Sequence, residues 1–128
     1  PNLNAVLGCA QMEQLDSKIA AKRQINDRYR AYLAEAEDST SSYKLIETVP
    51  GSRSNYWLNA IQCPDRNARD SLLETLNEEK VMARPIWELM YRLPAFAGSI
   101  GATCPIAETL VDTVVNVPSW PMITSASQ

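Results

Sequence analysis

The segment 56-YWLNAIQCPDRNARDSLLETLNEEKVMAR-84 places a strand, a helix and a second strand in close succession. Residues 56–63 have the aromatic and aliphatic content of a strand. Asp65 then stands where an N-cap is preferred, at the start of an amphipathic helix predicted over 66–79. A short strand is predicted over 81–84. Three apolar residues of the helix share one face and are expected to point inward: Leu72, Leu73 and Leu76.

Strands and helices continue on both sides of this segment. Upstream, residues 43–49 have the content of a further strand. Downstream, residues 85–104 lack a regular pattern, a helix is predicted to begin at Pro105, and 114–117 is a last short strand. This order predicts an α+β fold with a small, mostly antiparallel sheet flanked by helices.

The N-terminal part of the chain is predicted to be one long helix over residues 1–37, followed by an α+β core over 43–118 and a tail over 119–128. Gly8 and Ala10 are small residues that permit close approach of another backbone. The first turns therefore look like a packing surface without an obvious partner in so short a chain. The residues at helical spacing are Leu3, Leu7, Ala10, Leu15, Ile19, Ile25, Tyr29, Tyr32 and Leu33.

The composition is that of a single globular domain. The chain has 128 residues, of which 45% are hydrophobic, and this is enough to bury a core. Its net charge of -3 and the absence of a clustered basic face argue against nucleic-acid binding. No apolar run approaches the roughly 20 residues of a membrane span, so no membrane partner is expected.

Cysteine and histidine content excludes several kinds of site. The three cysteines, Cys9, Cys63 and Cys104, are widely spaced and odd in number, which favours a reducing, cytoplasmic compartment over a disulfide framework. The chain has no histidine, so it holds neither a histidine zinc site nor a Ser-His or Cys-His catalytic system. No metal site and no catalytic residue are predicted.

The loop over residues 84–92 is the strongest candidate for a binding site. It brings together a guanidinium, an indole and a phenol, from Arg84, Trp87 and Tyr91. These groups are used to hold anionic or polyhydroxylated ligands. The alternative is that Trp87 and Tyr91 belong to the core and that Arg84 is a surface ion-pair partner.

Five separated blocks of the chain resemble the C-terminal part of the DegT/DnrJ-type sugar-nucleotide aminotransferases. The blocks are 1-PNLNAVLGCAQMEQLD-16, 29-YRAYLAE-35, 56-YWLNAI-61, 69-RDSLLETLNEEKVMARPIWELMYRLPAF-96 and 104-CPIAETLVDTVVNVPSWP-121. The resemblance covers nearly the whole chain and keeps the order of the family. It implies the small C-terminal domain of a fold-type-I enzyme that uses pyridoxal phosphate, with residues 1–37 packing on a missing large domain or on a partner subunit.

The resemblance also implies an activity. Family members transfer an amino group, usually from glutamate, to a keto carbon of a nucleotide-linked sugar, in amino-sugar biosynthesis for surface polysaccharide, and act as homodimers. Pyridoxal phosphate is held by a lysine of the large domain. The lysines of this chain, Lys18, Lys22, Lys44 and Lys80, do not match that context. The chain alone is therefore expected to be inactive.

Site residues carry over only where the motif matches. By resemblance, Arg84 is expected to bind an anion, either the donor carboxylate or a substrate phosphate, and Trp87 and Tyr91 are expected to line the substrate cleft. Many relatives have histidine at the position of Tyr91, so a proton-transfer role of that position does not carry over, because a phenol stays protonated near neutral pH. Asn2 and Asn4 are candidates for the cofactor-binding or dimer side.

An alternative from a different functional class remains open. The chain is then a free-standing, non-catalytic dimerisation or interaction module derived from the family, and its N-terminal helix docks on a partner. A truncated domain is expected to expose the apolar helix face, whereas an independent module is expected to cover it.

Overall fold

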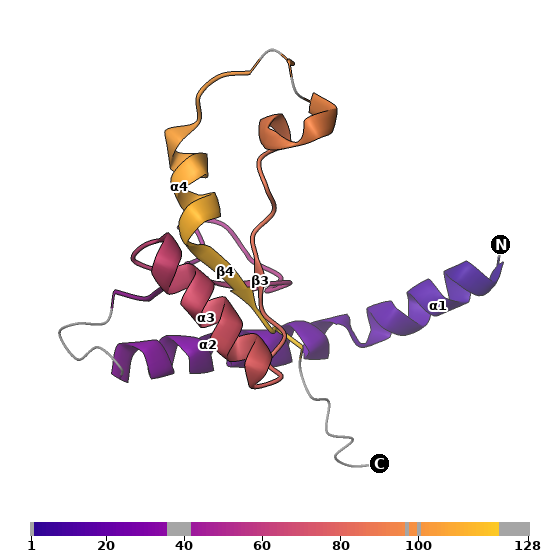
Figure 1. Cartoon of the computed structure of the whole chain (residues 1–128). Helices are drawn as coiled ribbons and strands as arrows, with labels where there is room; N and C mark the ends of the chain where they lie inside the picture. Colours follow the sequence, from indigo (N-terminus) through magenta and orange to yellow (C-terminus); the bar gives the residue numbers. More distant parts are fainter. Residues whose placement is uncertain (1, 36–41, 97, 100, 121–128) are drawn as a thin grey trace.

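The computed structural model describes residues 2–35, 42–96, 98–99 and 101–120 (Figure 1). The second helix runs along a small sheet and the first projects away from it. The third helix packs on the sheet and against the fourth, and an irregular excursion carries two short 3-10 turns. The elements are α1 (Asn2–Glu13), α2 (Leu15–Glu35), β1 (Lys44–Leu45), β2 (Asn59–Gln62), α3 (Arg66–Glu78), β3 (Arg84–Pro85), η1 (Met90–Arg92), η2 (Pro94–Phe96), α4 (Pro105–Thr113) and β4 (Val114–Val117).

The sheet has four strands in the order β1-β2-β4-β3, and every neighbouring pair is antiparallel. The predicted α+β fold with an antiparallel sheet is confirmed. In the register, Ile61 lies opposite Val115 and Arg84 lies opposite Asn116. Because β3 is an edge strand, Pro85 can take part in it although it has no N–H to donate.

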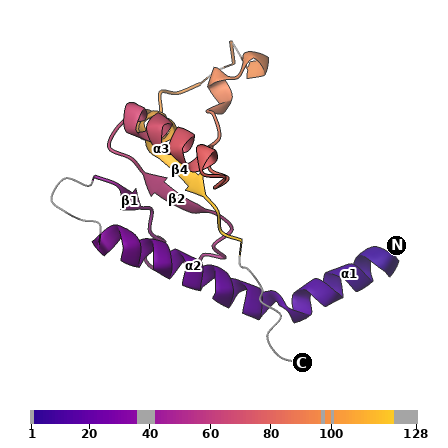
Figure 2. The same ribbon diagram turned by 60° about the horizontal axis from the view of Figure 1, so that its bottom comes forward.

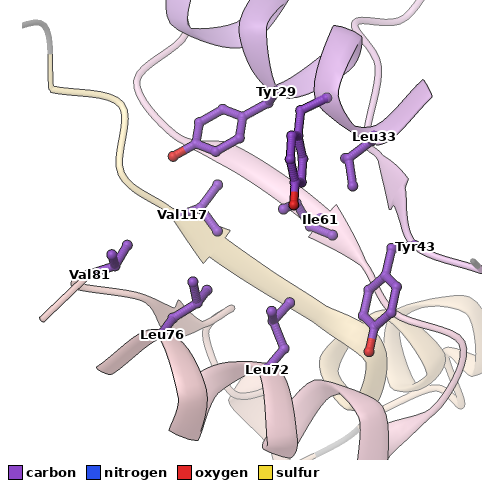
Figure 3. Close-up of a pocket in the computed structure, with 9 residues that line it drawn as sticks. Tyr29, Leu33, Tyr43, Ile61, Leu72, Leu76, Val81 and Val117 are labelled. Atoms are coloured by element: carbon purple, nitrogen blue, oxygen red, sulfur yellow. The ribbon is translucent and has the colours of Figure 1, made fainter. Parts of the chain in front are cut away.

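Helices α2 and α3 cover the same face of the sheet. Tyr29 and Leu33 of α2 and Leu72 and Leu76 of α3 point toward one another above Ile61 and Val117 of the strands (Figure 3). The Asp65 carboxylate accepts a hydrogen bond of 2.9 Å from the backbone N–H of Ala68, which confirms the predicted N-cap of α3. The buried residues of this core are Ile61, Cys63, Ala83, Val115 and Val117.

The N-terminal helix departs from the prediction of one continuous helix over 1–37. It is divided at Gln14 into α1 and α2, and α1 projects beyond the rest of the domain (Figure 2). The Ser17 hydroxyl donates to the Gln14 carbonyl at 2.8 Å, next to the division. No residue of α1 is buried, and a hydrogen bond from the Lys18 ammonium to the Gln11 side chain links the two helices across the division. Residues 1, 36 and 37 of the predicted helix lie outside the described residues.

Three strands differ from their predicted ranges, and for two of them the preceding backbone gives the reason. The strand expected over 81–84 is observed at Arg84–Pro85, because the exit from α3 uses the preceding residues. Lys80 has a positive φ of 64°, and the Val81 N–H donates to the Leu76 carbonyl at 2.8 Å. The strand expected over 56–63 begins only at Asn59, since Tyr56 also has a positive φ, of 52°.

The first strand is also shorter than predicted, and the last helix and strand keep their predicted positions. The strand expected over 43–49 is shorter, at Lys44–Leu45, whereas α4 begins at Pro105 and β4 occupies Val114–Val117 as predicted. Of the predicted tail over 119–128, residues 121–128 lie outside the described residues. None of the helices in the described ranges is long and apolar enough to cross a bilayer.

Candidate functional site

A groove of about 750 Å³ opens where α2, β3 and the end of β4 meet. Its lining includes all three tryptophans of the chain, Trp57, Trp87 and Trp120, together with Lys22, Arg84 and Asn116. The aromatic side chains come from three separate parts of the sequence. The fold therefore gathers one kind of side chain at one place.

Trp57 and Trp87 form the aromatic centre of the groove. Their ring centroids are 5.9 Å apart and their planes are tilted by 35°. Both side chains remain open to solvent, with exposed fractions of 65% and 68%, and Trp120 is exposed at 82%. Indole faces exposed in this way bind the apolar faces of sugar rings and the flat faces of bases.

Arg84 supplies a positive charge beside these rings. It lies opposite Asn116 on the neighbouring strand, so the two side chains point to the same face of the sheet. Its recorded contact is a weak one, from Nη2 to the sulfur of Met82 at 3.8 Å. Within the part of the chain that the structure describes, no carboxylate forms an ion pair with Arg84. Its guanidinium is available for an anionic ligand.

Lys22 is the second cation of the groove. Its ammonium donates to both the carbonyl oxygen and the Oγ of Ser119, each at 3.0 Å. Burial lowers the pKa of Lys22. The groove thus combines two cations with three indoles, and no acidic side chain is among the described residues that line it.

Tyr91 lies apart from the groove. Its hydroxyl donates to the Glu108 carboxylate of α4 at 2.6 Å, and this hydrogen bond raises the pKa of Tyr91. The structure therefore brings Arg84 and Trp87 together, and it places Tyr91 on the excursion against α4. Asn2 and Asn4 lie on exposed α1 and are not among the residues that line the groove.

Several residues of the groove could not be identified as site residues from the sequence alone. From the sequence, Trp57 falls in a predicted strand, Trp120 in the predicted tail and Lys22 in the predicted N-terminal helix. The chain has three tryptophans but a single phenylalanine, and this imbalance was the available signal. Nothing local in the sequence shows that Lys22 and Ser119, which are 97 residues apart, are in contact.

A second cavity of about 350 Å³ lies between α2, α3 and the sheet (Figure 3). Its walls are almost entirely apolar and are made of residues that also build the core, such as Ile61, Leu72 and Val117. It contains no charged side chain to orient a ligand. It is part of the core packing, and the tryptophan groove is the better candidate site.

The model of the DegT/DnrJ/EryC1/StrS aminotransferase family matches residues 1–128, the whole of the chain. The chain belongs to this family. The resemblance seen in the five sequence blocks is thus confirmed. Aminotransferases of this family depend on pyridoxal phosphate.

Two of the curated relatives with similar sequences are GDP-perosamine synthases. The chain is 30% identical over 123 residues to a GDP-perosamine synthase of Vibrio cholerae, covering 94% of this chain and 32% of the relative. It is 27% identical over 124 residues to the GDP-perosamine synthase of Escherichia coli O157:H7, covering 97% and 32%. The chain therefore spans about a third of the length of the curated relatives that it matches.

Solved structures support the fold. A protein of Bacillus cereus described as a PLP-dependent aminotransferase superposes with a TM-score of 0.79 at 20% identity, covering 94% of this chain and 32% of that one. A DegT/DnrJ/EryC1/StrS aminotransferase of Brucella abortus gives a TM-score of 0.72 at 20% identity, covering 92% and 30%. The fold of the described residues is thus that of one part of a family aminotransferase.

The residues of this chain do not themselves fit pyridoxal phosphate. Such a site needs a lysine for the covalent link and an acidic or basic partner for the ring nitrogen. Among the described lysines, Lys22 is the one that lines the groove, and its ammonium is already hydrogen-bonded to Ser119. Among the described residues that line the groove, none has a carboxylate that could bind the ring nitrogen of pyridoxal phosphate. No step of the reaction is therefore assigned to the cofactor within this chain.

Proposed function

We propose that residues 1–128 are the C-terminal small domain of a pyridoxal-phosphate-dependent sugar aminotransferase. The intact enzyme transfers an amino group from glutamate to a nucleotide-linked keto sugar, in amino-sugar biosynthesis for surface polysaccharide. It is a cytoplasmic homodimer, and its cofactor is held by a larger domain outside this chain. One observation supports the proposal most strongly. The family model matches the whole chain, whereas the chain covers only about a third of the length of each sugar aminotransferase that it resembles.

The tryptophan groove is the contribution of this chain to substrate binding. Arg84, without a carboxylate partner among the described residues, pairs with a phosphate of the sugar nucleotide or with the carboxylate of the amino donor. Trp87, together with Trp57, supports a sugar ring or a base by stacking. Tyr91 lies outside the groove, on the excursion against α4, and would line the substrate cleft only in the intact enzyme. When bound, pyridoxal phosphate supplies the electron sink for the reacting carbon, and the groove holds the substrate in place.

Helix α1 is the contact with the rest of the enzyme. Four large apolar side chains on it are exposed: Leu3, Val6, Leu7 and Met12. A Cβ added at Gly8 would meet no atom within 4 Å, so this face is open to another backbone. An apolar helix of this kind fits the larger domain or a partner subunit. Asn2 and Asn4 would then lie on the cofactor or dimer side.

The proposal is tested by an activity assay on the polypeptide that carries this chain. The protein is incubated with glutamate and a panel of keto sugar nucleotides, and the products are analysed by mass spectrometry. We expect formation of an amino sugar nucleotide that depends on added pyridoxal phosphate. Residues 1–128 alone are expected to form none. Lack of product with every keto sugar nucleotide, despite bound cofactor, would contradict the sugar-aminotransferase function.

A further inference from the structure

Helix α2 is connected to the tryptophan groove by a short series of hydrogen bonds. The Lys22 ammonium donates to Ser119 Oγ at 3.0 Å, and Ser119 Oγ donates in turn to the backbone carbonyl of Trp57. A hydroxyl has one hydrogen to donate and two lone pairs to accept, so Ser119 can serve both partners at once. The Lys22 ammonium also donates to the Ser119 carbonyl, which fixes the serine backbone.

Lys22, Ser119 and Trp57, which form this series, all line the groove. Ser119 is buried, with an exposed fraction of 7%, whereas the Trp57 side chain is 65% exposed. The segment before β2 is not part of a strand, and its backbone is held by side chains. The Trp57 N–H is bonded to the Asn55 side chain at 3.0 Å, and its carbonyl is bonded to Ser119. Ser119 therefore holds the backbone of Trp57 at its carbonyl, directly beside the Cα from which the indole projects.

Two other contacts place α2 against the same region. The Asn26 side chain donates to Asn59 Oδ1 at 3.0 Å, and the Tyr29 hydroxyl donates to the Pro118 carbonyl at 3.1 Å. These contacts hold β2 and the end of β4. Lys22 differs from Asn26 and Tyr29 because it binds Ser119, and the Ser119 hydroxyl binds the backbone carbonyl of Trp57.

We propose that Lys22 is a positioning residue that sets the Trp57–Trp87 pair through Ser119. This role rests on the proposed function of the groove, because a fixed pair of indoles is useful only where a flat ligand is bound. Lys22 does not need to touch the substrate. Its removal leaves the buried Ser119 carbonyl without this donor and releases the Trp57 backbone to move.

The geometry of the pair gives a readout that fold stability alone does not move. Two indoles at a centroid distance of 5.9 Å couple electronically and give an exciton couplet in circular dichroism. Trp87→Phe, in the full polypeptide that carries this chain, defines the couplet by difference from the wild type. We expect Lys22→Met to lose the same couplet, while its helical signal and melting temperature stay near those of the wild type. Lys22→Arg, which keeps a donor, is expected to restore a large part of it.

Ser119→Ala gives a second route to the same result if Lys22→Met does not fold. It is expected to lose the couplet as well, and the double variant is expected to lose no more than either single one, because the two residues act in series. Lys18→Met, on the same helix but outside the groove, is the matched control and is expected to keep the couplet. A couplet that is intact in both Lys22→Met and Ser119→Ala would overturn the proposal.

Kinetics separate this proposal from the function of the groove. If both hold, Lys22→Met raises KM for the sugar nucleotide several-fold and leaves kcat at saturating substrate nearly unchanged. Loss of the couplet with an unchanged KM would support the positioning role and would contradict substrate binding in the groove. An increase in KM with an intact couplet would contradict the positioning role, since Lys22 would then bind the substrate directly.

Discussion

Trp57 and Trp87 lie next to each other across the mouth of the groove, with ring centroids 5.9 Å apart, although 30 positions separate them in the numbered sequence. Arg84 lines the same groove on the adjacent edge strand. A pair of indoles beside a guanidinium that has no carboxylate partner in the described part of the chain suits a ligand with both a flat surface and negative charge. The proposed sugar nucleotide has both.

Replacement of Arg84 tests the charge in the groove. Arg84→Ala is expected to raise KM for the sugar nucleotide or for the amino donor by roughly tenfold or more, because a charge-assisted hydrogen bond contributes about 1.5–3 kcal/mol. Arg84→Lys is expected to recover only part of the loss, since lysine lacks the bidentate fork. Arg53→Ala, an exposed arginine outside the groove lining, is the control. Unchanged steady-state kinetics with both substrates would remove Arg84 from the site.

The N-cap of α3 gives a prediction for stability. Asp65→Ala removes the acceptor of the Ala68 N–H and is expected to lower the free energy of unfolding by about 1 kcal/mol. Asp65→Asn keeps a side-chain acceptor and is expected to lose much less. Urea unfolding followed by circular dichroism measures both variants. An unchanged free energy of unfolding in Asp65→Ala would mean that the cap contributes little.

The Arg30–Glu47 pair gives a prediction for acid stability. The Arg30 guanidinium donates to both carboxylate oxygens of Glu47, at 2.8 and 2.7 Å, and lowers the pKa of Glu47. A carboxylate whose folded pKa is lowered stabilises the fold above its unfolded pKa, and this contribution is lost as the pH falls through the folded pKa.

Stability measured between about pH 5 and about pH 3 tests this pair. Glu47→Gln is expected to start from a lower stability at the upper pH and to lose less of it on acidification than the wild type. Glu74→Gln, an exposed glutamate of α3, is the control and is expected to follow the wild-type slope. Parallel slopes for Glu47→Gln and the wild type would contradict a contribution from the pair.

The cysteines report on what covers α1. Cys9 and Cys104 are exposed and Cys63 is buried, and burial raises the pKa of the Cys63 thiol. In residues 1–128 alone, Cys9 and Cys104 are expected to react quickly with a thiol reagent and Cys63 slowly. In the intact protein Cys9 is expected to be protected, because α1 then packs on the larger domain or partner subunit. Equal alkylation rates of Cys9 in both forms, measured by peptide mass spectrometry, would show that α1 stays uncovered.

Those parts of the fold that depend on neighbouring residues could be predicted from the sequence. The cap at Asp65, the start of α4 at Pro105 and the strand Val114–Val117 each follow from side chains close in the chain. The position of β3 could not be predicted, because the left-handed backbone at Lys80 carries the exit from α3 through the residues expected to form the strand. The division of the first helix at Gln14 also leaves no clear mark in the apolar spacing.

The candidate site was only half predictable. Arg84 and Trp87 lie within four residues of each other, so their chemistry could be recognised in one loop. Trp57 and Ser119 are 62 residues apart, and Lys22 and Ser119 are 97 apart, so their contacts exist only once the sheet has formed. Tyr91 is close to Trp87 in sequence, but its hydrogen bond to Glu108 holds it on the excursion against α4.

Borohydride reduction of the native polypeptide that contains this sequence, followed by mass spectrometry of the modified peptide, shows directly which lysine carries the cofactor. We expect a polypeptide roughly three times as long as this chain, as the 32% coverage of the Vibrio cholerae relative suggests, with a pyridoxyl-lysine outside residues 1–128. A pyridoxyl group on Lys22 or another lysine of this chain would contradict the assignment of the cofactor to a separate domain. A native product of 14.2 kDa without the modification would contradict the enzyme and favour a free-standing interaction module.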